Sequence, residues 1–375
     1  MDAHEKILIL GGTGHFGARI ARRLAGAPGI ELIVTSRDQF RAEVLVDELL
    51  AANPDSSITA LALNQEAADF EAAVRSIKPF IVVHTAGPYQ GQDYRVARAC
   101  IDSGSHYIDL ADGRQFVAGI GALNETAREA GVIVVSGAST LPGLSSAVIA
   151  NLRDRFSRIE TIDISIAPAQ QTPRGVGTVA GVLSYCGRPF EALVDGRWET
   201  HYGWQELRRQ QYPELGARLS AVCDVPDLEL LPRMVPGVRT VSFRAALELA
   251  WEHVALWCMA WLTRRNLVED WSKRARSLSG ISRRLSRFGS DTGGMTVSVG
   301  GQGPEGDPLH LDWQLTARDN HGPEIPCTPA IILVRKLLHD EFLGRGAVAC
   351  INLFSLEDFM QEVVSYSITT TVEER

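Results

Sequence analysis

The sequence lacks the cysteine pattern of a disulfide framework or a zinc site. Its six cysteines lie far apart in the 375-residue chain and none forms a CxxC pair, whereas both kinds of site use closely spaced cysteines. A long apolar run is missing too, because the longest one, 254–262, is well short of the ~20 residues that cross a bilayer as a helix. We therefore expect reduced thiols, no bound metal and no membrane-spanning segment.

An excess of positive charge is also absent. The net charge of -8 and the pI near 5.7 argue against nucleic acid as a main partner. Lysine is scarce, and none of Lys6, Lys78, Lys273 and Lys336 has the surroundings of a catalytic lysine, so we do not expect Schiff-base chemistry.

The first strand candidate begins near Lys6, which leaves no room for a leader peptide and predicts a cytoplasmic location.

The residues that are present are typical of a globular protein with two domains. Hydrophobic residues make up 45% and charged residues 22%, as in ordinary soluble domains, and the chain is longer than most single domains. In the first third, amphipathic helix-length segments separate the β-rich runs KILIL, ELIVTSR, SITALAL, FIVVHTAG, HYIDLA and GVIVVSGA. This alternation predicts an α/β fold with a Rossmann-type, doubly wound parallel sheet over 1–145.

The pattern changes after Pro142. A helix from about Leu144 precedes the strand IETIDISIAP, Asp195-Gly196 is typical of a hairpin turn, and MTVSVGG and HLDWQLTARD alternate like antiparallel strands. A last helix is expected over 329–339. We expect residues 146–326 to form an α+β domain for the substrate and for homodimer formation, and a segment over about 327–375 to return to the first domain.

The stretch GGTGHFG follows the first strand and opens a helix. It contains the GxGxxG spacing of dinucleotide-binding turns, in which the first glycine, Gly12, permits the tight turn, the second, Gly14, lets the backbone approach a pyrophosphate, and the third, Gly17, packs the helix on the strand. The helix N-terminus adds N–H donors for the phosphates. The predicted cofactor-binding residues of this turn are Gly12, Thr13, Gly14, His15, Phe16 and Gly17.

The end of the second strand favours NADP(H) over NAD(H). An NAD site would place a carboxylate there for the ribose hydroxyl, but the chain reads VTSRD, with Ser36 and Arg37 in its place. A hydroxyl and a guanidinium suit a 2′-phosphate. Asp38 is the alternative ribose ligand if the strand ends later.

The same stretch also fits the GxxGxxG spacing of short-chain dehydrogenases. Those enzymes need a tyrosine with a lysine four residues later, and no tyrosine in this chain has one. That class is therefore disfavoured.

Three segments together resemble the saccharopine dehydrogenase family, in particular its reductase-like members: the opening fingerprint, VVHTAGPYQGQDYRVARACIDSGSHYIDLADG and GASTLPGLSSAVI. The run from Trp313 through TPAIILVRKLL to GAVACINLFSLEDF is similar to the end of those proteins. The resemblance implies NAD(P)-dependent hydride transfer, with a carbon–nitrogen bond as the favoured reacting group and an amino-acid-like or imine substrate.

Further site residues follow from the strand ends and the resemblance. The backbone of Ala86, Gly87 and Pro88, after the fourth strand, is predicted to lie against the cofactor. The catalytic candidates are Tyr89, Tyr107 and Asp109, at or beyond the ends of the fourth and fifth strands, where open α/β folds bind ligands. In GASTLPGLSS, which resembles family segments beside the nicotinamide, Ser139 and Thr140 are candidates for the carboxamide or substrate, with helix capping as the alternative. Arg174, in PRGVGT, is a candidate for a substrate carboxylate.

Two other functions remain open. One is reduction of an enoyl or carbonyl group on a lipid or polyketide intermediate, and the other is a non-catalytic NADP-binding regulator or scaffold.

The Trp-rich helix over 246–265, followed by a basic segment, permits peripheral membrane contact through 246–288. We favour a core or dimer-interface helix with a solvated basic face.

Overall fold

The structure is a computed structural model that describes residues 4–342 and 344–375. The chain divides into two compact units, each built from two segments. Unit 1 contains Met1–Thr140 and Pro326–Cys350, and unit 2 contains Leu141–Ile325 and Ile351–Arg375. The returning segment of unit 1 is shorter than the expected 327–375, because the last strand of the chain pairs within the sheet of unit 2.

Unit 1 contains a parallel sheet in the order β15-β6-β5-β4-β1-β2-β3. Its strands are β1 (Glu5–Leu10), β2 (Ile30–Ser36), β3 (Ser57–Ala62), β4 (Ile81–His84), β5 (His106–Asp109), β6 (Ile133–Ser136) and β15 (Gly346–Ala349). The order reverses between β1 and β4, which is the switch point where doubly wound folds bind ligands. Every residue of β4, β5 and β6 is buried, as expected for strands covered on both faces.

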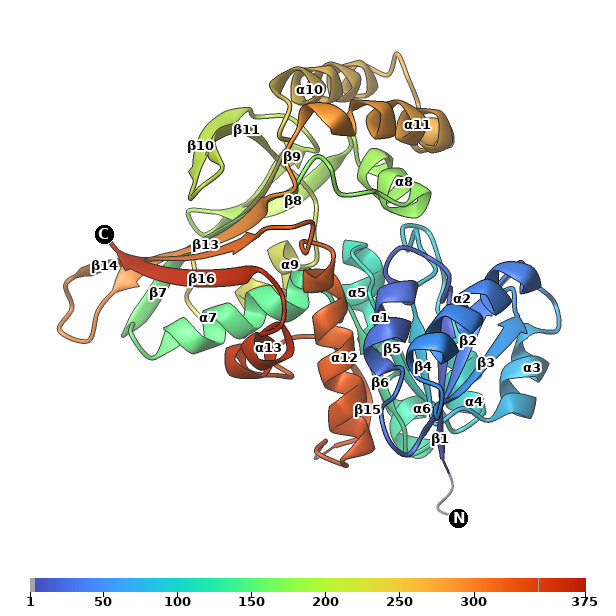
Figure 1. Cartoon of the computed structure of the whole chain (residues 1–375). Helices are drawn as coiled ribbons and strands as arrows, with labels where there is room; N and C mark the ends of the chain where they lie inside the picture. Colours follow the sequence, from blue (N-terminus) through green and yellow to red (C-terminus); the bar gives the residue numbers. More distant parts are fainter. Residues whose placement is uncertain (1–3, 343) are drawn as a thin grey trace. The chain divides into compact units, whose positions relative to one another are not determined.

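Helices lie on both faces of this sheet (Figure 1). They are α1 (Gly17–Leu24), α2 (Gln39–Ala52), α3 (Phe70–Ile77), α4 (Arg95–Asp102), α5 (Arg114–Gly119), η1 (Ile120–Leu123) and α6 (Asn124–Glu129), with α12 (Glu324–Leu338) leading the chain back into the unit. The helix predicted over 329–339 corresponds to α12. It begins five residues earlier than predicted, at Glu324, and Pro329 lies inside the helix instead of at its first turn.

Unit 2 contains a mixed sheet in the order β10-β11-β12-β7-β13-β14-β16 and a separate hairpin, β8-β9. The strands are β7 (Arg158–Ala167), β8 (Pro189–Val194), β9 (Arg197–Tyr202), β10 (Arg208–Tyr212), β11 (Gly216–Val222), β12 (Thr240–Ala246), β13 (Gly293–Gln302), β14 (Pro308–Ala317) and β16 (Ile368–Glu374). Only β12 and β7 pair in parallel among the described strands of this sheet. In β7, Ile162 and Ile164 are fully buried while Asp163 is partly exposed, so the two faces of the strand differ in polarity.

The helices of unit 2 are the π-helical turn η2 (Thr140–Leu144), which begins at the last residue of unit 1, followed by α7 (Ser145–Arg153), α8 (Val176–Ser184), α9 (Asp227–Met234), α10 (Ala250–Arg264), η3 (Ser272–Arg274), α11 (Ala275–Leu285), η4 (Ser286–Phe288) and α13 (Leu356–Glu362). The predicted Trp-rich helix is α10. It begins at Ala250 and not at Ala246, because residues up to Ala246 pair in β12. In the described chain, no helix combines the length and the apolar character that crossing a membrane requires.

The predicted fold class, a doubly wound parallel sheet followed by a second unit of mixed α and β structure, is confirmed. The predicted hairpin is also found: Asp195 and Gly196 join β8 to β9 with φ of 49° and 82°, as a type I′ turn requires. Of the two predicted positions for the Trp-rich helix, the core does not hold for Trp251 and Trp261, whose exposed fractions in the single chain are 53% and 39%; the dimer interface stays a prediction.

Candidate functional site

The turn between β1 and α1 is closely packed against its neighbours. Gly11 has the left-handed φ of 79°, and a Cβ atom there would lie 3.1 Å from Cβ of Ala86. A Cβ atom on Gly12 would lie 2.8 Å from Cγ1 of Val34. The left-handed residue of the turn is therefore Gly11, which precedes the predicted motif, while Gly12 is needed for contact with β2.

Gly17, the first residue of α1, allows the helix to start against the ends of β1 and β4. A Cβ atom on Gly17 would collide with the carbonyl oxygen of Gly11 and lie 2.7 Å from Oγ1 of Thr85. The N–H groups of Thr13, His15 and Phe16 donate no hydrogen bond within the described chain. Such unpaired donors at a helix N-terminus form an anion-binding site, so the turn fits a pyrophosphate.

His15 is uncharged at neutral pH. Burial, together with the adjacent Arg19 guanidinium, lowers the pKa of His15 to about 4. Arg19 Nη1 lies 2.8 Å from the carbonyl oxygen of His15, to which it donates a hydrogen bond. The positive charge beside the turn is therefore that of Arg19.

The end of β2 lies next to the same turn. Ser36 is the last residue of the strand, and its Oγ accepts hydrogen bonds from Oγ1 of Thr13 at 3.1 Å and from N of Asp38 at 3.2 Å. Arg37 is exposed, and its side chain has no ion-pair or hydrogen-bond partner in the part of the chain that the structure describes. Asp38 is the N-cap of α2, where its carboxylate accepts from N of Arg41.

The segment after β4 is held close to the turn. Oγ1 of Thr85 donates to the carbonyl oxygens of Leu10 and Gly11 at 2.9 and 3.1 Å. Gln92 Nε2 donates to the carbonyl oxygens of Ala86 and Pro88, which fixes the backbone on either side of Gly87. The predicted cofactor residues of this loop thus lie beside the glycine turn at the switch point.

The three catalytic candidates are buried. The hydroxyl of Tyr89 donates to the carbonyl oxygen of His84 at 2.7 Å, and the hydroxyl of Tyr107 lies 2.9 Å from Nδ1 of His84. Exposed fractions are 5% for Tyr89 and 0% for Tyr107 and Asp109. Both tyrosine hydroxyls are therefore occupied inside the protein.

Asp109 connects β5 to β6. Its Oδ1 accepts hydrogen bonds from N of Ala111, Oγ of Ser136 and N of Gly137 at 2.8–3.0 Å, while its buried Oδ2 has no partner in the described chain. Burial raises the pKa of Asp109 to about 6, although these hydrogen bonds act to lower it. This carboxyl group can therefore hold a proton near neutral pH.

Ser139 and Thr140 follow β6 and are half-buried. Neither hydroxyl caps α7, whose N-terminus receives no side-chain hydrogen bond from its N-cap, and neither has a hydrogen-bond partner among the described residues. Both hydroxyls are thus available to a ligand.

Arg174 belongs to unit 2 and precedes α8. Its Nη2 donates to Oε1 of Gln170 at 3.3 Å, and Glu252 and Glu248 are close enough to oppose the lowering of its pKa by burial. Its role as an anchor for a substrate carboxylate stays a prediction.

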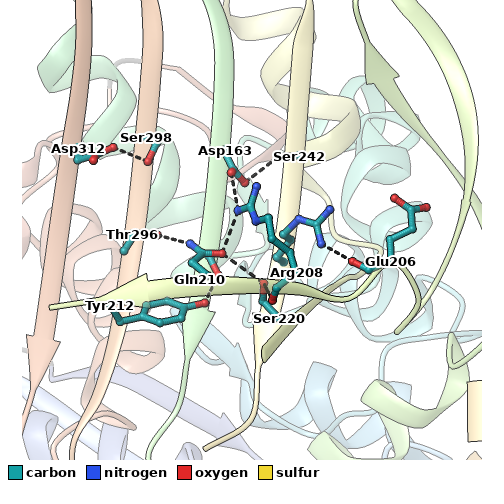
Figure 2. A network of polar contacts seen from close by, with 12 residues as sticks. Asp163, Glu206, Arg208, Gln210, Tyr212, Ser220, Ser242, Thr296, Ser298 and Asp312 are labelled. Carbon is teal, nitrogen blue, oxygen red and sulfur yellow. Dashed lines mark hydrogen bonds and ion pairs between the residues drawn. The ribbon is translucent and has the colours of Figure 1, made fainter. Parts of the chain in front are cut away.

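A larger polar network covers one face of the sheet in unit 2. Figure 2 shows β10 lying across the neighbouring strands, with Arg208 directed at Asp163 and Gln210 directed at Thr296, at 2.7 and 3.2 Å. Asp163 also accepts from Oγ of Ser242 at 2.7 Å. The three pairs Arg208–Asp163, Gln210–Thr296 and Ser242–Asp163 are hydrogen-bonded within the unit. The network therefore holds β10 against the sheet, and these contacts leave no role for a ligand there.

Comparison with known proteins agrees with this geometry. Residues 7–135 match the family model described as the saccharopine dehydrogenase NADP binding domain. The match lies within the first segment of unit 1. The predicted resemblance is thereby confirmed, and unit 1 has the fold and sequence of a nicotinamide-dinucleotide-binding domain.

The similar solved structures extend the fold to the whole chain. Apo saccharopine dehydrogenase (L-Glu forming) from Saccharomyces cerevisiae superimposes with a TM-score of 0.70 at 14% identity, covering 99% of this chain and 100% of that one. Amine dehydrogenase from Mycobacterium smegmatis gives a TM-score of 0.51 at 11% identity over 92% and 95% of the two chains. No curated protein sequence gives a significant match.

Sequence reasoning missed several residues that build the site. Thr35 and Thr85 lie on two sides of the turn. Thr35 accepts from N of Gly11 while donating to the carbonyl oxygen of Ile9, and Thr85, just after β4, donates to the carbonyl oxygens of Leu10 and Gly11. Ser136 holds Asp109. Their common signal is a hydroxyl at or just beyond the carboxyl end of a buried strand.

Proposed function

We propose that this protein is an NADP(H)-dependent oxidoreductase that transfers a hydride at a carbon–nitrogen bond of an amino-acid-like or imine substrate. The observation that carries the proposal is the glycine turn with three unpaired N–H donors beside Ser36 and an unpaired Arg37. Hydride transfer is the chemistry that a nicotinamide cofactor supplies when bound.

The 2′-phosphate explains the end of β2 better than a ribose hydroxyl does. The carboxylate of Asp38, which is the alternative NAD ligand, is engaged at the start of α2. Arg37 is exposed and free to form charge-assisted hydrogen bonds. Ser36 is already positioned by Thr13, so the phosphate and the pyrophosphate would be held by one connected set of residues.

The ends of β4, β5 and β6 supply the remaining roles. We assign the backbone of 86–88 to cofactor contact and the free hydroxyls of Ser139 and Thr140 to the carboxamide or the substrate. Because Tyr89, Tyr107 and Asp109 are buried, we assign them as positioning residues below the reacting groups. A protonated imine needs no strong general acid, which is consistent with the absence of an exposed acid–base pair among these candidates.

A second candidate function is reduction of an enoyl or carbonyl group on a lipid intermediate. It is supported by the exposed tryptophans of α10, Trp251 and Trp261, which would favour contact with an apolar substrate carrier. A parallel screen of imines, amino acids and enoyl thioesters, followed by NADPH absorbance, distinguishes the two.

Cofactor titration tests the proposal directly. We expect Arg37→Ala to weaken NADPH binding by about tenfold to hundredfold, the range for a lost hydrogen bond to a charged group, and to leave NADH binding unchanged in calorimetry. Arg75→Ala is the matched control, because Arg75 is exposed on α3 away from β2. NADH binding that is tighter than NADPH binding and insensitive to Arg37→Ala would contradict the cofactor assignment.

A further inference from the structure

The helix α10 presents an apolar face to solvent. Trp251, Val254 and Trp261 are 53%, 44% and 39% exposed, and their spacing places them on one side of the helix. The opposite side is formed by buried residues: His253, Leu256, Ala260 and Thr263. The larger aromatic residues therefore point outward and the smaller and more polar ones inward, the reverse of an ordinary surface helix.

The orientation of α10 is fixed by contacts within unit 2. Gln205 Nε2 donates to the carbonyl oxygen of Trp257 at 3.1 Å, and Nε1 of Trp271 donates to that of Met259 at 3.0 Å. The turn at Gly187 approaches α10 so closely that a Cβ atom there would lie 2.8 Å from Cβ of Thr263. These contacts within unit 2 therefore fix the outward orientation of Trp251 and Trp261.

The segment after α10 is strongly basic. Between 264 and 287 the chain has eight basic residues and two acidic ones, in a protein whose net charge is -8. Lys273 pairs with Glu269, but Arg276, Arg283 and Arg284 have no carboxylate partner among the described residues. The same segment also exposes apolar side chains: Leu267, Ile281 and Phe288 are 54–65% exposed.

The apolar and basic groups belong to one end of unit 2. Figure 1 draws α10 and α11 at the same end of the unit, and α8 packs against α11, while the turn at Gly187, directly after α8, packs against α10. We define the lipid-facing surface as the exposed side chains of α10 and of 264–288.

We propose that the lipid-facing surface binds peripherally to a bilayer that contains anionic lipids. Tryptophans lie favourably at the level of the headgroups, and unpaired arginines are attracted to lipid phosphates. The positive charge of 264–288 favours an anionic bilayer over a second copy of the chain as the binding partner, because a twofold interface would bring two basic segments together.

Vesicle co-sedimentation of the full-length protein tests the proposal. We expect sedimentation with vesicles of phosphatidylcholine and phosphatidylglycerol at low salt, weaker binding at high salt, and little binding to phosphatidylcholine alone. Trp251→Ser with Trp261→Ser, and separately Arg283→Glu with Arg284→Glu, should each lower the partition coefficient by about tenfold or more. Circular dichroism checks that these exposed substitutions leave the fold intact.

Matched controls use exposed residues elsewhere. Trp198→Ser removes a tryptophan of β9 that is 50% exposed, and Arg75→Glu with Arg98→Glu reverses two exposed charges on α3 and α4; both should bind vesicles like the original protein. Failure to sediment with anionic vesicles, or equal binding by all variants, would overturn the proposal. So would a dimer in light scattering that only the tryptophan pair dissociates, without vesicle binding by the original protein, because the occupant would then be a second copy.

Discussion

Gly17 is the residue whose replacement the cofactor turn tolerates least. An alanine methyl group there would meet the carbonyl oxygen of Gly11 and Oγ1 of Thr85, so α1 would have to move away from the ends of β1 and β4. Overpacking of this kind costs about 1–3 kcal/mol. We expect Gly17→Ala to lower the thermal unfolding midpoint and to weaken NADPH binding in calorimetry. Gly121→Ala is the control, because a Cβ atom at Gly121 meets nothing within 4 Å; similar behaviour of both variants would contradict this packing argument.

Asp109 links stability to pH. Its pKa of about 6 in the folded protein exceeds the ordinary value of 3.8, so between about pH 4 and 6 the folded state binds more protons than the unfolded state. The free energy of unfolding should therefore fall as the pH rises through this window, by about 3 kcal/mol from this residue. We expect Asp109→Asn to reduce that slope in urea unfolding at pH 4 to 7. An unchanged slope would show that the carboxyl group titrates normally.

At the scale of elements, one buried hydrogen bond joins the starts of α7 and α9. Oγ of Ser145 donates to Oδ1 of Asp227, whose Oδ2 has no partner in the described chain. Burial raises the pKa of Asp227 to about 7, so the carboxyl group is charged mainly above neutral pH. Ser145→Ala should lower the free energy of unfolding by about 1–3 kcal/mol at pH 8 and by less at pH 5. Urea titrations at both pH values measure this, and an equal loss at pH 5 would mean that the carboxyl group is already charged there.

The elements also show which features the sequence could predict. The central strands of the parallel sheet are buried on both faces, so they read as short apolar runs, and all six predicted runs of the first third are strands, including the more exposed edge strand β3. The glycine turn was predictable as a phosphate-binding turn, but the predicted GxGxxG motif does not include Gly11, its left-handed residue. That residue is decided by Ala86, which lies in the loop after β4 and approaches Gly11 only in the folded sheet.

The orientation of α10 was not predictable from its composition. The helix is apolar on most sides, so its tryptophans suggested burial. The inward face is set by the turn at Gly187, which is too close for large side chains and therefore selects Ala260 and Thr263. The same limit applies to Asp109, whose partners Ser136 and Gly137 are supplied by a strand distant in sequence.

At the scale of the whole molecule, the C-terminal strand β16 completes a sheet whose first strand along the chain is β7. β16 forms the edge of the sheet in unit 2 by pairing with β14, and Nε of Arg375 lies 2.8 Å from Oδ2 of Asp312, a side chain that is 5% exposed. A chain that stops at Tyr366 would therefore leave β14 with an unpaired edge and would remove Arg375 from Asp312, whose Oδ1 keeps Ser298 and His310 as partners. Open edges of this kind promote association, and the loss of one charged partner of a buried carboxylate is destabilising.

We expect this truncation to lower the thermal midpoint of unit 2 and to produce concentration-dependent association in light scattering. Arg375→Gln is the matched variant, because it removes the ion pair and keeps β16, so it should lose stability without associating. NADPH binding serves as an internal reference, since every residue we assign to the nucleotide lies in unit 1. Retained binding in a chain whose unit 2 has become unstable would show that the two units fold with separable stability. A truncated chain that is monomeric and as stable as the original would instead show that β16 contributes nothing to the sheet it borders.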